Sequence, residues 1–423
     1  MAQQSTLSAV IAELRHRCVF RVPAIYVGIA FVLLLGCQKP QGELNPSSSY
    51  IFVWANDEDS DDSDFLVVID ARPASPRYGR IITTLPVGYK DTKAHHTEHR
   101  MHESGVLFAN GFKAGRTFRF DLTDPEKPKL LGSFGSRGAY TYPHSFERLP
   151  NGNVLATFQN KGEGNTEEGG LVELDPNGNF IRAVSASAQD VTNFIRPYSL
   201  AIVPELNRVV STSADMRASD ISRVVQVWNL TELSPIKTIY LSAESFGTAE
   251  PRVLQDGITV IFSTFTCDLY KINGLAGDNP SAELVYSFPF KENMLCALPV
   301  VSGEYWIQAV PSIPALVSLD ISDSSNPVEV SRLEFENKEL PDIDWPHWIS
   351  LEPNGERIVV TGYRGLFNRL LIVNLNKQTG ALSFDKAFRE EGSEEIGINF
   401  AREIWPHGDT GSAIPHGSVF SLN

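Results

Sequence analysis

Short apolar runs separated by polar turns fill the chain from Tyr50 onward, and almost no stretch has helical period. Runs of this kind, bounded by Gly, Pro, Asn and Asp, predict β-strands. Six similar runs carry an Asp or Asn at or near their end, where its side chain can bond the amides of the following turn. They span residues 65–70, 117–122, 171–175, 224–229, 315–320 and 370–375. These acidic and amide residues are therefore expected to serve the fold.

The runs group into units of four strands that recur about every 50 residues. Such repetition indicates a radial array, because one unit cannot bury its apolar face alone. Six complete sheets are expected, at 95–134, 144–185, 198–241, 250–287, 294–333 and 347–388. Three strands at 50–86 and one at 417–422 remain and make a seventh sheet. The prediction is an all-β, seven-bladed β-propeller whose last blade is closed by N- and C-terminal strands, which removes free sheet edges.

A Pro-His or Pro-Tyr pair recurs just before the predicted innermost strands, at Pro143-His144, Pro197-Tyr198, Pro346-His347 and Pro415-His416. The residue that precedes an innermost strand is expected to point toward the propeller axis. In register, this position is held by His95 or His96, His144, Tyr198, Ala249 or Glu250, Leu295, His347 and His416. Four consecutive sheets therefore present histidine to one mouth of the channel.

Imidazoles from separate blades that meet on the axis predict a metal site. A single histidine in a turn is more often only a hydrogen-bonded polar residue, but four at one repeat position favour ligands. Neutral nitrogen donors without thiolate favour copper or iron over magnesium or calcium, and the sequence does not choose between the two. The predicted ligands are His95, His96, His144, His347 and His416, with His407 as a further candidate. An alternative for the N-terminal histidines is a metal-binding patch on the surface, made of His95, His96, His99 and His102.

Two other residue types complete the predicted site. Tyr198 is placed to orient a substrate or donate a proton. Glu98, like Glu103 or Asp344, is a candidate carboxylate partner for a ligating imidazole. No phosphate-binding loop, nucleophile elbow or helical His-Glu-x-x-His motif occurs in the sequence.

The N-terminus predicts export. Residues 1–36 resemble a signal peptide, with three arginines, an apolar run too short to span a membrane and a Leu-Leu-Gly-Cys end. That end resembles a bacterial lipobox, so Cys37 is the predicted lipidation site and 37–49 a lipid-anchored linker to the propeller at 50–423. A plain secretory signal is the alternative. Either one implies an exported protein, and the lipobox places it at the bacterial cell envelope.

An oxidising compartment leaves two interpretations of the remaining cysteines. Cys267 and Cys296 either form a disulfide or are two buried small residues. The acidic stretch 57–64 is likewise open to two interpretations, a solvated hairpin tip or a calcium site. The net charge of −15 argues against nucleic acid as a partner, since phosphate contacts need clustered Lys and Arg.

Several segments resemble the selenium-binding protein and methanethiol oxidase family. They are 64–70, 73–79 with Leu85-Pro86, the pair His95-His96, 169–175, and 401–404 with Gly408-Asp409. The resemblance implies a seven-bladed propeller and a copper-dependent oxidase that converts methanethiol to formaldehyde, hydrogen sulfide and hydrogen peroxide. It also places His95, His96 and His144 at family histidine positions.

Two departures bear on function. The family's cysteine motif after the paired histidines is replaced by 98–102, which argues against selenium binding through that cysteine. The family's Ala-His-Glu appears as Ala401-Arg402-Glu403, so His347, His416 or His407 is expected to supply the missing imidazole.

The leading hypothesis is an envelope-anchored propeller that oxidises a small molecule with dioxygen at a copper or iron centre. It binds the membrane only through its lipid. A noncatalytic surface propeller that binds a protein or glycan partner is the alternative, and a metal-dependent lyase or hydrolase at the same site is a third possibility.

Overall fold

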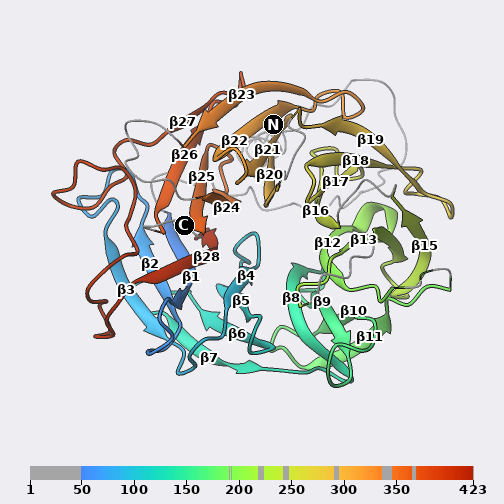
Figure 1. Cartoon of the computed structure of the whole chain (residues 1–423), viewed down its shortest axis with the longest axis horizontal. Coiled ribbons are helices and arrows are strands. Elements are labelled where there is room, and N and C mark those ends of the chain that lie inside the picture. The colour runs from blue at the N-terminus through green and yellow to red at the C-terminus, as the bar shows by residue number, and fades with distance from the viewer. Residues whose placement is uncertain are drawn as a thin grey trace, which may run out of the picture. The chain divides into compact units, whose positions relative to one another are not determined.

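Seven four-stranded antiparallel sheets form a ring in the computed structural model, which confirms the predicted seven-bladed β-propeller (Figure 1). The structure describes residues 49–189, 191, 193–217, 223–241, 247–289, 295–335, 345–363 and 368–422. The predicted signal peptide, Cys37 and Asp344 lie outside these residues.

The blades follow chain order, each with its innermost strand first. Blade 1 contains β28 (Ala413–Phe420), β1 (Tyr50–Asp57), β2 (Phe65–Asp70) and β3 (Ile81–Pro86), and blade 2 contains β4 (Ala94–Thr97), β5 (Val106–Gly111), β6 (Arg116–Asp121) and β7 (Lys129–Phe134). Blade 3 contains β8 (Tyr140–Arg148), β9 (Val154–Lys161), β10 (Gly170–Leu174) and β11 (Phe180–Ser185), and blade 4 contains β12 (Pro197–Val203), β13 (Arg208–Ser213), β14 (Val224–Asn229) and β15 (Ser234–Tyr240).

The remaining blades have the same order. Blade 5 contains β16 (Thr248–Val253), β17 (Val260–Thr264), β18 (Asp268–Asn273) and β19 (Ser281–Ser287), and blade 6 contains β20 (Pro299–Ser302), β21 (Tyr305–Val310), β22 (Ala315–Asp320) and β23 (Val328–Glu334). Blade 7 contains β24 (Trp345–Leu351), β25 (Arg357–Tyr363), β26 (Leu370–Leu375) and β27 (Leu382–Phe384). One short 3-10 helix, η1 (Pro204–Leu206), lies between β12 and β13.

Closure of the ring follows the prediction. The C-terminal β28 pairs antiparallel with β1, with Val53 opposite Ser418 and Phe52 opposite Val419. Both strands are almost wholly buried because blades 7 and 2 pack on either side of them. The chain ends therefore complete one sheet and leave no open edge in the ring.

Four predicted boundaries need correction. The inner strand of blade 6 begins at Pro299, later than the expected 294, and blade 7 ends at Phe384 rather than 388. The inner strands β8 and β28 begin at Tyr140 and Ala413, each four residues earlier than expected. The segment 385–412 contributes only isolated bridges, and its Phe388, Phe400 and Trp405 are buried against blades 7 and 1. It closes an apolar surface that the strands alone would leave exposed.

The strand-end acids have the predicted turn role. Asp70, Asp121, Asp175 and Asp320 each accept a hydrogen bond from the backbone amide two residues later, at 2.8–3.1 Å. These bonds satisfy amides that the sheet does not pair.

An identical β-bulge interrupts six of the seven inner strands. In blade 3, Pro143 pairs with Phe158 and Phe146 pairs with Ala156, so His144 and Ser145 both face Thr157. A bulge of this kind re-aims side chains at the end of a strand. The histidines expected just before the strands thus lie inside them, at the bulge, and this corrects the prediction.

In four of the six bulges, the side chain opposite holds the bulge in shape. His96, Ser145, Ser199 and Glu250 each donate a backbone N–H to a side-chain oxygen across the strand pair, respectively on Asn110, Thr157, Thr212 and Ser263, at 2.7–3.4 Å. The same side chains reach onward to a bulge carbonyl of the next blade, as Asn110 does to His144 and Thr157 to Tyr198. The bulges are therefore linked around the channel.

Cys267 and Cys296 form a disulfide in the structure, with Cα atoms 5.1 Å apart. Both residues are buried between blades 5 and 6, so the disulfide interpretation is the one that the structure supports. Among the described residues, no helix is long and apolar enough to cross a membrane.

Candidate metal centre

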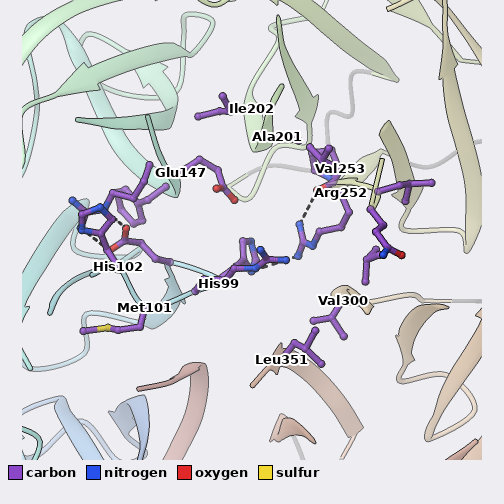
Figure 2. Close-up of a pocket in the computed structure, with 18 of the residues that line it drawn as sticks. His99, Met101, His102, Glu147, Ala201, Ile202, Arg252, Val253, Val300 and Leu351 are labelled. Atoms are coloured by element: carbon purple, nitrogen blue, oxygen red, sulfur yellow. Dashed lines mark hydrogen bonds and ion pairs between the residues drawn. The ribbon is translucent and has the colours of Figure 1, made fainter. Parts of the chain in front are cut away.

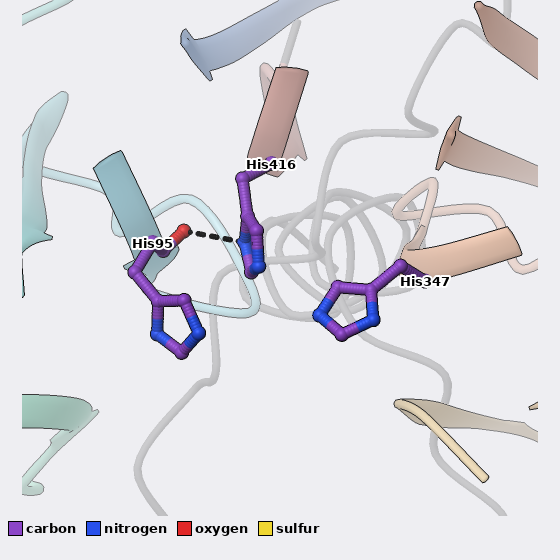
Figure 3. A group of neighbouring side chains, drawn as sticks. All are labelled: His95, His347 and His416. Carbon is purple, nitrogen blue, oxygen red and sulfur yellow. Dashed lines mark hydrogen bonds between the residues drawn. The ribbon is translucent and has the colours of Figure 1, made fainter. Parts of the chain in front are cut away.

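Five histidines converge on the channel, and their ligand atoms form two groups that share one residue. His95, His347 and His416 make the first group, which Figure 3 shows projecting from three different strands, and His95, His96 and His144 make the second. Within each group the ligand atoms lie within 4.8 Å of one another. Adjacent rings are 4.1–5.0 Å apart between centroids, as for His96 and His144 or His95 and His144. The predicted convergence is therefore present.

Two of these rings are oriented by equivalent backbone contacts. The Nδ1–H of His144 donates to the carbonyl of Tyr198 at 2.6 Å, and the Nδ1–H of His416 donates to the carbonyl of His95 at 2.9 Å. In both cases the acceptor is the first bulge residue of the next blade. Because Nδ1 carries the proton, the lone pair lies on Nε2, as in a histidine prepared for metal binding.

The donor set fits a metal. Nδ1 of His95 and Nε2 of His144 have no hydrogen-bond partner among the described residues, although both side chains are buried. A buried nitrogen lone pair without a partner is costly, and a bound cation removes that cost. His95 belongs to both groups, so it is the residue through which either ligand set is completed.

The imidazoles are held neutral. Burial, followed by the neighbouring imidazoles, keeps the pKa of His95 and of His96 well below the ordinary value. Burial lowers the pKa of His144 to about 4, although its bond to Tyr198 opposes the shift. Neutral imidazole is the form that binds a metal, so the centre is ready for one at neutral pH.

Tyr198 lies beside the second group, as predicted. Its hydroxyl is 3.4 Å from Nε2 of His96, and its ring centroid is 4.3 Å from that of His144. Nδ1 of His96 contacts the Ser145 hydroxyl at 2.9 Å. Each ring nitrogen of His96 therefore contacts a hydroxyl group. His96 can bind a metal through Nε2 only when its contact with the Tyr198 hydroxyl is broken.

The first group opens into a small pocket at the mouth where the inner strands begin. This pocket, here called the mouth pocket, has a volume of about 180 Å³. Its lining is Lys93, His95, Met216, Leu295, Pro311, Trp345 and His347. A small molecule that enters it meets two of the candidate ligands.

A larger cavity of about 630 Å³ occupies the other end of the channel, where the inner strands finish (Figure 2). His99, which lines it, stacks on Trp348 at 4.9 Å and lies with Nε2 3.4 Å from the Glu250 carboxylate. Burial opposes ionisation of Glu250, but Arg252, His99 and Ser199 outweigh it and hold its pKa well below the usual value. This layer separates the cavity from the histidine cluster.

Glu147 also lines the cavity. Burial raises the pKa of its carboxyl to about 7, and the positive charges of Arg252 and Arg100 limit the rise. The carboxyl therefore titrates near neutral pH.

Three predicted site residues lie away from the cluster. Both carboxylate oxygens of Glu98 bind the Arg148 guanidinium, so Glu98 anchors blade 2 to blade 3. His407 contacts Thr84 through Nδ1 and Asp409 through Nε2, at 2.6 and 3.0 Å, on the outer part of blade 1. His102 bonds Ser104 in a turn, which leaves no surface patch of four histidines.

Other features of the site escaped the sequence analysis. The repeat register placed Ala249 or Glu250 toward the axis, but nothing in the sequence marked the contact of Glu250 with His99. Gly417 is the second bulge residue of blade 1, and a Cβ there would lie 2.6 Å from the carbonyl oxygen of His95.

Fold and site together define a seven-bladed propeller with a buried polyhistidine centre on its axis. No family model matches the chain. The chain is similar to methanethiol oxidases and selenium-binding proteins, which confirms the resemblance seen in the sequence.

Three comparisons carry this similarity. A methanethiol oxidase of a Hyphomicrobium species is 36% identical over 116 residues, 26% of this chain and 26% of that protein. The methanethiol oxidase of Danio rerio is 22% identical over 426 residues, 83% of this chain and 91% of that protein. The solved structure of a hypothetical selenium-binding protein from Sulfolobus tokodaii superposes with a TM-score of 0.71 at 17% identity, covering 88% of this chain and 94% of that one. The last comparison shows the fold alone.

Proposed function

We propose that this protein is a metal-dependent oxidoreductase of a small molecule, with copper as the metal and a thiol as the substrate. The observation that carries the proposal is the pair of histidine groups that share His95, with buried lone pairs on His95 and His144. The similarity to methanethiol oxidases supports the reaction class. The matched segment spans only 26% of the Hyphomicrobium enzyme, so activity and substrate belong to the proposal.

The residues of this chain would act in the following way. His95 would hold the metal together with His347 and His416, or together with His96 and His144. A bound copper ion supplies the one-electron chemistry that the oxidation of a thiol by dioxygen needs. Neutral nitrogen donors favour copper over the hard cations, and iron is the alternative.

Tyr198 is the residue placed to hold a proton. Burial, followed by the charge of Glu250, keeps the pKa of its phenol well above the ordinary value, so the hydroxyl keeps its proton throughout the neutral range. The disulfide-linked loop places Phe265 edge-on to its ring at 5.3 Å between centroids.

Export of the chain through residues 1–36 and attachment through a lipid on Cys37 complete the proposal and place the enzyme in the bacterial cell envelope. The basis is the Leu-Leu-Gly-Cys sequence at 34–37. Mass spectrometry of the membrane fraction tests it, since a lipidated N-terminal cysteine gives a defined mass increase that Cys37→Ser removes.

Oxygen uptake by the copper-loaded protein tests the activity. A panel of short alkanethiols should consume dioxygen and release hydrogen peroxide, and His144→Ala should abolish uptake together with bound copper. The matched control is His102→Ala, whose ring bonds only Ser104 among the described residues and should leave both unchanged. Copper-loaded protein that takes up no oxygen with any thiol would contradict the proposal and favour the noncatalytic propeller.

A further inference from the structure

The backbone of Lys93, at the mouth pocket, has a conformation that its surroundings must hold in place. Its backbone φ is 54°, and that of Asp91 is 50°, so two residues of this short loop are in the left-handed region. Non-glycine residues in that region carry a conformational cost and persist only where their surroundings hold them.

Polar side chains of blade 1, one of them fully buried, hold the loop on both sides of Lys93. Asp64, which is fully buried, accepts the backbone N–H of Thr92 at 2.7 Å and also the Thr92 hydroxyl. Asn56 bonds Ala94 twice, accepting its N–H at 2.6 Å and donating to its carbonyl at 3.2 Å.

Blade 2 contributes two further contacts to the same loop. The Phe112 N–H donates to the Lys93 carbonyl at 2.9 Å. A Cβ at Gly111 would lie 2.7 Å from the Thr92 side chain, so glycine is what lets the loop pack on β5. The loop that presents Lys93 is therefore fixed by both neighbouring blades.

The side chain of Lys93 lines the mouth pocket beside His95 and His347. Its ammonium has no ion-pair partner among the described residues, whereas Lys113 and Lys129 pair with Asp91 and Asp121. The other walls are apolar and come from Met216, Leu295, Pro311 and Trp345. The pocket thus combines one fixed positive charge, apolar walls and candidate metal ligands.

We propose that Lys93 makes the mouth pocket selective for small anions with an apolar body, and that the substrate binds there as a short-chain thiolate. This inference rests on the proposed function for the identity of the anion. The pocket is small, with a volume of about 180 Å³, so it suits a short chain. A charge-assisted contact with the ammonium favours the anion over a neutral molecule of the same size.

Tryptophan fluorescence of the metal-free protein tests the charge directly. Of the six tryptophans in the sequence, Trp345 is 42% exposed and lines the pocket, and the other five are at most 2% exposed. Iodide should quench Trp345 in the wild type about twofold to fourfold more effectively than in Lys93→Gln, because the ammonium concentrates the anion. Neutral acrylamide should quench both proteins equally.

Three further variants complete this experiment. Lys93→Arg should keep the iodide response, and Lys127→Gln, which removes an exposed lysine on the outer part of blade 2, should not change it. Trp345→Phe should remove most quenching. Lys93→Asn tolerates a left-handed φ better, so it should fold at least as stably as the wild type and still lose the iodide response. Equal iodide quenching of wild type and both uncharged variants would overturn the inference.

Binding to the copper-loaded protein tests the substrate class. Calorimetric titration with ethanethiol should show about tenfold to a hundredfold weaker binding to Lys93→Gln, with unchanged affinity for neutral dimethyl sulfide. Equal losses for both ligands would contradict charge selection. A wild type that binds no copper would defeat the proposed function, while the iodide comparison would still decide the role of Lys93.

Discussion

His416 donates a hydrogen bond from Nδ1 to the carbonyl oxygen of His95, 2.9 Å away and 321 residues apart in sequence. The contact joins the C-terminal strand of blade 1 to the first strand of blade 2. It also sets the tautomer of one candidate ligand by means of the backbone of another. The site therefore depends on closure of the ring, and the same bond from His144 to Tyr198 shows that the arrangement is repeated.

Gly417→Ala should disturb this contact. The added Cβ would lie 2.6 Å from the His95 carbonyl oxygen and 2.7 Å from the Thr97 nitrogen, so β28 and β4 must move apart. We expect a loss of about 2–4 kcal/mol in the free energy of unfolding, together with weaker copper binding. Chemical denaturation and copper titration measure the two effects.

Gly135→Ala is the matched control, because its Cβ would meet only one backbone atom, at 3.6 Å. Unchanged stability and copper affinity in Gly417→Ala would show that the ring closure does not position the ligands.

Acid should destabilise the metal-free protein through His144. The pKa of this imidazole is about 4 in the folded chain against 6.5 as its ordinary value, so the unfolded chain binds more protons between these pH values. The free energy of unfolding must then fall as pH decreases through this window, by about 2 kcal/mol from pH 7.5 to pH 5 for His144 alone. Urea denaturation at several pH values measures the slope.

Other groups also titrate in this range, so the comparison is with His144→Gln, which has no charge at any pH. The variant should lose stability less steeply on acidification. Parallel curves for the two proteins would mean that His144 is not held neutral by burial.

Tyr198→Phe separates catalysis from metal binding. The hydroxyl contacts Nε2 of His96 but is not among the groups of candidate ligands. Copper content should be retained, while the rate of oxygen uptake should fall by about a hundredfold if the phenol supplies a proton. Full activity in this variant would remove Tyr198 from the chemistry.

Reduction of the Cys267–Cys296 disulfide should lower stability. The bond closes a loop of 29 residues, and cross-links of this length contribute about 3–4 kcal/mol. Cys267→Ser with Cys296→Ser should show this loss in denaturant and no further response to dithiothreitol. An identical midpoint for wild type and double variant would show that the disulfide does not stabilise the fold.

Much of the fold follows from the sequence because blade strands are short, apolar and regularly spaced. The repeat also gave the right blade for each of five histidines. It placed them before the strands rather than within them, since a bulge depends on the side chain opposite, such as Thr157 for His144. The pattern of apolar and polar residues along one strand does not show which side chain lies opposite it on the neighbouring strand.

Position in the repeat did not predict the role of residues whose contacts come from other parts of the chain. His407 follows Trp405-Pro406 in a local pattern like that of His416, yet Thr84 and Asp409 hold it on the outer part of blade 1. Lys93 carries no motif at all. Its place at the mouth pocket comes from a loop and neighbouring blades that only the folded ring brings together.

The central claim is that imidazoles of separate blades bind one metal ion on the propeller axis. Titration of the metal-free protein with Cu²⁺, followed by electron paramagnetic resonance, tests it most directly. We predict about one copper ion per chain with splittings from several imidazole nitrogens, and loss of this signal in His95→Ala, the residue common to both groups. A signal without nitrogen splittings, or one that persists unchanged in His95→Ala, would contradict the account.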